Sequence, residues 1–209
     1  MIEDGRLVQR NGRTTVFLRE ETGPARQKFT LAHELGHLLL AEPNEDMEAC
    51  RMPPVHFDSE ERFCDQFAAA LLLPKGWIES EFAKAEPSLG IARNVSSHSG
   101  VSLSASMLRL REVLGWQSSL LHWRRYQSAW RLVSTVGLPS PLHNQVISNE
   151  QTRAVLSSLA GSEQDLRGML PLIVRGRNCQ VPVEISAGLH GAVAMAAFLE
   201  AVHDPPSRA

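Results

Sequence analysis

The stretch FTLAHELGHLLL, Phe29 to Leu40, decides the fold of the first part of the chain. Its apolar residues recur at helical spacing, and within it His33, Glu34 and His37 form the pattern HExxH. Because an α-helix has about 3.6 residues per turn, both imidazoles project from one face, where they can reach a single tetrahedral Zn²⁺ at about 2.0–2.1 Å. Glu34 lies one position round the helix, placed to act as general base toward an attacking water. The alternative is an amphipathic helix that carries two hydrogen-bonded histidines.

A zinc hydrolase needs a third protein ligand and keeps its fourth position for water, so a further donor must follow this helix. The best candidate is Glu61, near the start of a second predicted buried helix that ends before Pro74. Asp65, one turn later on the same face, is placed to accept the free N–H of a liganding histidine. Glu60 is a rival for the ligand, and Cys64 is a second rival, although its position favours a small packed residue. For the whole segment, the alternative is a helix start whose acids interact with the helix dipole.

Two segments resemble the ImmA/IrrE-type metallopeptidases of bacteria and their mobile elements, and IrrE-like regulators most closely. These segments are RQKFTLAHELGHLLL, Arg26 to Leu40, and ERFCDQFAAALLLP, Glu61 to Pro74. The resemblance implies that His33, His37 and Glu61 hold zinc and that Glu34 is the general base, in agreement with the spacing. It also implies a substrate, a helix-turn-helix transcriptional repressor of the Cro/CI-like type that is cut to switch on stress-response or mobile-element genes.

We predict an α+β fold in three parts. Residues 1–86 form a gluzincin-like zinc peptidase core with a small antiparallel sheet, residues 87–116 a helix-turn-helix-like linker, and residues 117–209 a small α+β domain. In the first part, the alternating stretch Arg13 to Arg19 predicts a strand that borders the cleft. An extended substrate can add to that edge through main-chain hydrogen bonds, whereas a purely structural strand would only cover the helix.

The segment Gly90 to Gly115 predicts two helices joined by a turn, with Ser102 as the cap of the second helix. Arg109 and Arg111 stand on that second helix. The net charge of −2, however, is not that of a protein that neutralises many phosphates, so direct DNA binding is not favoured. A helical hairpin that joins two domains is the preferred interpretation.

From about Trp116 the pattern changes to short strands around a helix. We predict strands at 119–123, 129–136, 169–174 and 180–185 and the helix at 149–160. The stretch Val146 to Phe198 is similar to the GAF-like domain of IrrE-type regulators, which implies a site for a small signalling ligand. A packing or dimerisation domain without a ligand is the alternative. The histidines of this part lack metal-type spacing and are expected to be ordinary surface or core residues: His122, His143, His190 and His203.

The sequence therefore predicts a zinc-dependent endopeptidase that acts on a protein, although two imidazoles and a carboxylate also suit manganese. Beyond the metal, the stabiliser of the oxyanion is predicted to be Tyr126 or His56, and no motif places either residue. The principal rival is a regulatory protein that keeps the fold, with or without the metal, and acts by docking on a repressor. A direct DNA-binding activator that uses the segment Gly90 to Gly115 is the third hypothesis.

The composition predicts a cytoplasmic protein. No apolar run approaches the roughly 20 residues that a membrane-spanning helix requires. The three cysteines form no CxxC pattern, so a disulfide framework is not expected.

Overall fold

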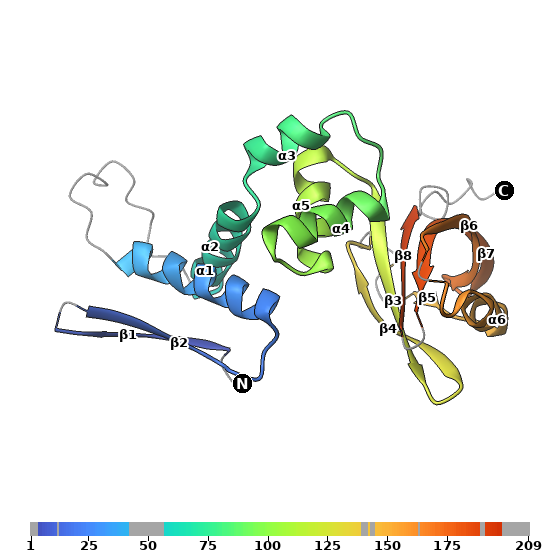
Figure 1. Ribbon diagram of the computed structural model, residues 1–209, viewed down its shortest axis with the longest axis horizontal. Helices are drawn as coiled ribbons and strands as arrows, with labels where there is room; N and C mark the ends of the chain where they lie inside the picture. Colours follow the sequence, from blue (N-terminus) through green and yellow to red (C-terminus); the bar gives the residue numbers. More distant parts are fainter. Residues whose placement is uncertain are drawn as a thin grey trace, which may run out of the picture. The chain divides into compact units, whose positions relative to one another are not determined.

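The computed structural model describes residues 4–11, 13–41, 57–138, 142, 145–162, 164–188 and 191–197. The fold is α+β, with helices and antiparallel sheets (Figure 1). The chain divides into two compact units. Unit 1 comprises Met1–Glu81 with Val95–Ser106, and unit 2 comprises Phe82–Asn94 with Met107–Ala209. The predicted domain boundaries after residues 86 and 116 stay predictions.

Unit 1 begins with a β-hairpin. Strand β1 (Gly5–Arg10) pairs antiparallel with β2 (Arg13–Leu18), and Arg10 lies opposite Arg13. The two residues between the strands are Asn11 and Gly12, the sequence that favours the tightest hairpin turn, and Asn11 has the positive φ of 50° that such a turn requires. The strand predicted from Arg13 is therefore present, and its partner β1 was not predicted.

Helices α1 (Pro24–Ala41) and α2 (Phe57–Leu72) follow the hairpin in the described chain. Proline is favourable at the first position of α1, because a helix leaves that N–H without an internal partner. The two helices pack through small side chains, since Ala32, Cys64 and Ala68 are all buried. Their closest approach is at Gly36, where a Cβ atom would lie 3.0 Å from Cys64 Cα and 3.1 Å from its Sγ. Glycine at this position therefore lets α2 come near the HExxH turn.

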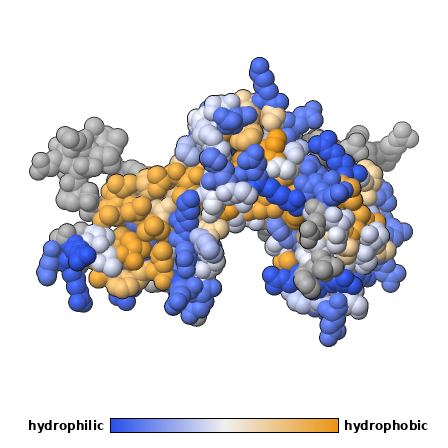
Figure 2. All heavy atoms as spheres, in the orientation of Figure 1, coloured by the Kyte–Doolittle hydropathy of each residue, from blue (hydrophilic) through white to orange (hydrophobic). Residues whose placement is uncertain are grey.

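One side of α1 is left exposed by the described residues of unit 1. Leu31, Leu35 and Leu39 recur every four residues and are 41%, 36% and 47% exposed. We call these three residues the leucine row. Figure 2 shows hydrophobic residues gathered over the part of the molecule that holds α1 and the hairpin.

Three short helices follow α2: α3 (Lys75–Phe82), α4 (Leu89–Ser99) and α5 (Leu103–Leu114). Helix α2 ends before Pro74, as predicted. Gly100, with a φ of +63°, forms the turn after α4, and the Ser102 hydroxyl accepts a hydrogen bond from the Ala105 N–H at 3.1 Å. The predicted pair of helices with a Ser102 cap is therefore present.

Unit 2 contains a six-stranded antiparallel sheet with the strand order β4-β3-β8-β7-β6-β5. Its strands are β3 (Ser118–Tyr126), β4 (Ala129–Val136), β5 (Val146–Ile147), β6 (Leu166–Val174), β7 (Arg177–Ala187) and β8 (Gly191–Ala197). Helix α6 (Glu150–Leu159) begins at the Asn149 cap, whose side chain accepts the Thr152 N–H at 2.8 Å. The predicted helix and four predicted strands are present, whereas β8 in the centre of the sheet was not predicted.

The core of unit 2 lies between the sheet and α6. Trp123, Trp130 and Leu172 from the sheet and Leu156 from α6 belong to one buried apolar cluster and are at most 2% exposed. The opposite face of the sheet carries more polar side chains, among them His122 and Ser186. Among the residues that the structure describes, no helix is both long enough and apolar enough to span a membrane.

Candidate metal centre

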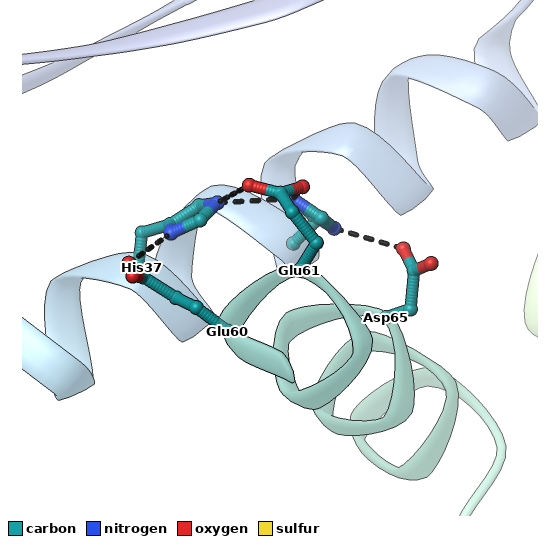
Figure 3. Close-up of polar contacts among 5 residues, drawn as sticks. His37, Glu60, Glu61 and Asp65 are labelled. Atoms are coloured by element: carbon teal, nitrogen blue, oxygen red, sulfur yellow. Dashed lines mark hydrogen bonds and ion pairs between the residues drawn. The ribbon is translucent and has the colours of Figure 1, made fainter. Parts of the chain in front are cut away.

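The candidate metal centre lies in unit 1, where α1 crosses α2 (Figure 3). The one-turn spacing of His33 and His37 brings their Nε2 atoms to 3.1 Å from each other. From α2, the Glu61 carboxylate reaches both rings, with Oε2 at 3.2 Å from His33 Nε2 and Oε1 at 3.3 Å from His37 Nε2. Three side chains from two helices thus direct their donor atoms to one point.

The spacing of these atoms fits a small tetrahedral cation. Ligands at about 2.0–2.1 Å from a tetrahedral Zn²⁺ lie about 3.3–3.4 Å from one another, because the edge of a tetrahedron is about 1.6 times its centre-to-corner distance. The observed separations of 3.1, 3.2 and 3.3 Å are close to that value. The side chains are 16%, 24% and 40% exposed for His33, His37 and Glu61, so the cluster is accessible from solvent.

Each imidazole has a second carboxylate on its other nitrogen. His33 Nδ1 lies 3.0 Å from Asp65 Oδ1, and His37 Nδ1 lies 3.1 Å from Glu60 Oε1 (Figure 3). A carboxylate at Nδ1 favours a proton on that nitrogen, which leaves the Nε2 lone pair free to bind a metal. Two Nε2 lone pairs and a carboxylate would then face one another, an arrangement that a cation stabilises. The donor set therefore fits the metal that HExxH implies.

Asp65 contacts His33 through Nδ1, and the sequence did not say which imidazole it would contact; its role as the partner of a metal ligand stays a prediction. Glu60, considered only as a rival ligand, instead contacts His37 through Nδ1. The sequence does carry a signal for Glu60. Carboxylates at positions 60, 61 and 65 of one helix can reach the Nδ1 atom of each imidazole and the point between the two Nε2 atoms.

Cys64 is the other candidate donor close to these histidines. Its Sγ and one ring nitrogen each of His33 and His37 all lie within 4.8 Å of one another. Burial raises the pKa of the Cys64 thiol to about 11, with a further contribution from the charge of Glu61, whereas metals bind the thiolate. The oxygens of Glu61 lie 3.2 and 3.3 Å from the two rings, and Cys64 packs against Gly36, so we favour Glu61 as the third donor.

Glu34 points toward the hairpin. A Cβ atom on Gly5 of β1 would lie 2.8 Å from Glu34 Oε1 and would overlap Cγ2 of Thr30, which is 7% exposed. Gly5 therefore leaves the space that the Glu34 side chain occupies. Sequence reasoning missed Gly5, because the strand that it begins, in which a glycine often marks a close approach, was not predicted. The strand next to Glu34 at this point is β1, the partner of the strand that was predicted to border the cleft.

The two candidates for oxyanion stabiliser stay predictions. Tyr126 ends β3 in unit 2 and is 45% exposed, with the Arg131 guanidinium 5.7 Å from its ring centroid. His56 lies outside the described residues.

The two arginines that supported DNA binding are engaged within unit 2. Arg109 is 9% exposed and pairs with Glu112 at 2.8 Å. Arg111 donates a hydrogen bond to the carbonyl of Ser118, and burial lowers the pKa of its guanidinium. Neither side chain presents its charge fully to solvent, which removes the main support for a DNA-reading α5.

One family model matches the first part of the chain. Residues 1–111 match the model of a peptidase family described as the IrrE N-terminal-like domain. The radiation response metalloprotease IrrE of Deinococcus deserti (strain DSM 17065 / CIP 109153 / LMG 22923 / VCD115) is 28% identical over 104 residues, which cover 46% of this chain and 36% of that relative. This chain thus matches well under half the length of the relative. A solved structure described as a Mycobacterium tuberculosis transcriptional regulator is similar with a TM-score of 0.47 and 13% identity, covering 87% of this chain and 59% of that one.

Proposed function

The chain belongs to the family of the IrrE N-terminal-like domain, and from this membership we propose that it is a zinc-dependent endopeptidase that acts on a protein. The family match and the IrrE relative make a metallopeptidase with a role in regulation the expected activity. The observation that carries the proposal is the convergence of His33, His37 and Glu61 at separations of 3.1–3.3 Å.

In this proposal His33 and His37 from α1 and Glu61 from α2 hold the metal, and manganese remains compatible with the same donors. Asp65 and Glu60 orient the two rings by accepting the Nδ1 protons. When bound, Zn²⁺ would supply Lewis acidity, which lowers the pKa of a water and polarises a carbonyl. Unit 1 would then be a gluzincin-like core.

Glu34 is the proposed general base. Its carboxylate would take a proton from the attacking water and pass it to the nitrogen of the leaving amine. Because Gly5 offers no side chain, the backbone of β1 approaches Glu34 closely, and we propose that this contact holds the carboxylate in place. An extended substrate would add to the hairpin edge through main-chain hydrogen bonds.

The proposed substrate is a helix-turn-helix repressor of the Cro/CI-like type, whose cleavage in the cytoplasm would derepress stress-response or mobile-element genes. The support for a regulatory target is family membership and the IrrE relative, called a radiation response metalloprotease. Unit 2 would be a GAF-like domain that controls the peptidase.

The test is Glu34→Gln, incubated with zinc and a helix-turn-helix repressor of the Cro/CI-like type. We expect cleavage to fall by a factor of about 10²–10⁴, because only the proton transfer is removed, while zinc content stays at the parent level. Fragments are measured by mass spectrometry and zinc by elemental analysis. The matched control is Glu81→Gln, on the exposed surface of the same unit, which should cleave like the parent.

A docking protein that does not cut its partner is the second candidate. The exposed leucine row on α1 favours it, because rows of this kind mark surfaces for other proteins. If Glu34→Gln relieves repression in cells as well as the parent does, docking accounts for the function and the endopeptidase proposal fails.

A further inference from the structure

A row of side chains crosses four strands of unit 2 on the face away from α6. The register places Ser134 of β4 opposite His122 of β3, His122 opposite Val193 of β8, and Val193 opposite Ser186 of β7. Since side chains alternate along a strand and the neighbours of His122 on β3 belong to the core, this row lies on the other face of the sheet.

The row forms part of the wall of a cavity of about 640 Å³ that is open to solvent. Arg124, two residues after His122 on β3, and Arg93 from α4 also line it, and every lining residue belongs to unit 2. Cavities that hold small molecules in proteins measure about 300–1,000 Å³. The cavity is therefore of the size for a small organic molecule.

The lining is suited to negative charge. Among the described residues that line the cavity are two arginines, a histidine and two serines, and none is acidic. Arg93 Nη1 lies 2.5 Å from Asp165 Oδ1, a contact that holds the guanidinium in position while using one of its five N–H donors. Arg124 is exposed and forms no ion pair within the part of the chain that the structure describes.

His122 gives a second indication of a ligand. Its Nε2 is buried and has no hydrogen-bond partner among the residues that the structure describes. Burial lowers the pKa of this imidazole, so the ring is neutral at neutral pH and offers one donor and one acceptor. Buried polar atoms in native proteins almost always have a partner, so His122, a residue that lines the cavity, carries a hydrogen-bonding nitrogen that the described chain leaves unused.

We propose that this cavity binds a small organic anion, with its carboxylate or phosphate held by Arg93 and Arg124. Guanidinium groups bind both anions through pairs of parallel hydrogen bonds. The polar remainder of the ligand would meet His122, Ser134 and Ser186, and its apolar part would meet Val193. The sequence predicted a small-molecule ligand for the C-terminal part of the chain, and this proposal specifies where that ligand binds and that it is an anion. The proposal does not depend on the metal centre.

The test is calorimetric titration of the full chain with adenosine 5′-monophosphate, succinate and inorganic phosphate, with adenosine as the uncharged control. We expect at least one anion to bind and adenosine not to bind. Arg124→Gln should weaken that binding about tenfold, the loss expected for one charge-assisted contact. Arg153→Gln, an exposed arginine on α6 at the other face of the sheet, should bind like the parent.

Ser186→Ala provides a second variant that leaves the arginines intact and should also weaken binding. Binding of inorganic phosphate or adenosine 5′-monophosphate would identify a phosphate group, and binding of succinate a carboxylate. The proposal is overturned if none of the three anions binds at millimolar concentration, or if Arg124→Gln and Arg153→Gln weaken binding equally.

Discussion

The two units hold their helices and strands together in different ways. In unit 2 one continuous apolar cluster, with Trp123, Trp130 and Leu172 among its members, joins α6 to the sheet. In unit 1 the buried residues between α1 and α2 are small, while the leucine row on α1 is exposed. The side chains that link α1 to α2 near the HExxH turn are instead polar: Glu60, Glu61 and Asp65 on α2 with the two histidines of α1.

The difference has a thermodynamic consequence. A hydrophobic core stabilises a unit without any ligand, whereas converging acceptor atoms repel one another until a cation joins them. Anything that binds only the folded state adds its binding free energy to stability. We therefore expect metal to stabilise unit 1 and to leave unit 2 unchanged.

The largest effect is expected for Glu61→Ala, which removes the carboxylate that links the two Nε2 atoms. Apparent binding free energies of structural zinc sites are about 10–16 kcal/mol, so the loss of one protein ligand should cost about 3–5 kcal/mol of zinc binding. Affinity is measured by competition with a chromophoric chelator. Cys64→Ala is the matched variant and should bind zinc like the parent; the reverse pattern would assign the third ligand to Cys64.

In contrast to Glu61→Ala, a core substitution in unit 2 should lower the stability of that unit and leave zinc affinity unchanged. Leu172→Ala in β6 leaves a cavity in the apolar cluster and should lower the free energy of unfolding of unit 2 by about 2–5 kcal/mol. Denaturant unfolding is followed by tryptophan fluorescence, to which the buried Trp123 and Trp130 of this unit contribute, in the background Trp77→Phe, which removes the tryptophan of unit 1. Zinc affinity should not change, and a large decrease in it would mean that the two units are not independent.

The carboxylates of Asp65 and Glu60, which contact the Nδ1 atoms of the imidazoles, should contribute about equally to zinc affinity. Asp65→Asn and Glu60→Gln each replace the charged acceptor of one Nδ1 proton by a neutral amide oxygen, and such carboxylate partners are worth about 10–100-fold in metal affinity. The chelator competition that measures Glu61→Ala also measures these variants, with Glu81→Gln as the control. An effect of Asp65→Asn alone would show that the contact of Glu60 with His37 is incidental.

The smallest effect is expected for Gly36→Ala. The new Cβ would lie 3.0–3.2 Å from the Cα, Sγ and Cβ of Cys64 and would push α1 from α2. Overpacking costs about 1–3 kcal/mol and alanine gains about 1 kcal/mol of helix propensity, so the net loss should be about 1 kcal/mol.

The readout for Gly36→Ala is the thermal unfolding of the zinc-loaded chain. Gly76→Ala in α3 is the matched control, because nothing lies within 4 Å of its added Cβ. That control should be as stable as the parent or slightly more stable. If Gly36→Ala and Gly76→Ala unfold at the same temperature, the close approach of α1 and α2 at Gly36 does not contribute to stability.

Much of the fold followed from local patterns. Helix α6 was predicted from apolar spacing alone, and strand β2 from alternation that starts at Arg13. Strand β1 was missed although Asn11-Gly12 is a strong hairpin signal, because its own stretch GRLVQR shows little alternation. Strand β8 was missed because GAVAMAA contains few residues that favour strands, and its position between β3 and β7 follows from the sheet.

The sequence by itself determined the pair His33 and His37, the carboxylates of the second helix and the family, because one helical turn fixes which side chains share a face. Only the tertiary structure decided that Asp65 faces His33 and Glu60 faces His37, that Gly5 leaves room for Glu34, and that Gly36 meets Cys64. It also assembled the cavity of unit 2 from four strands and a helix. These contacts join residues distant in the chain, and no local spacing sets the angle at which two helices cross or the order in which strands pair.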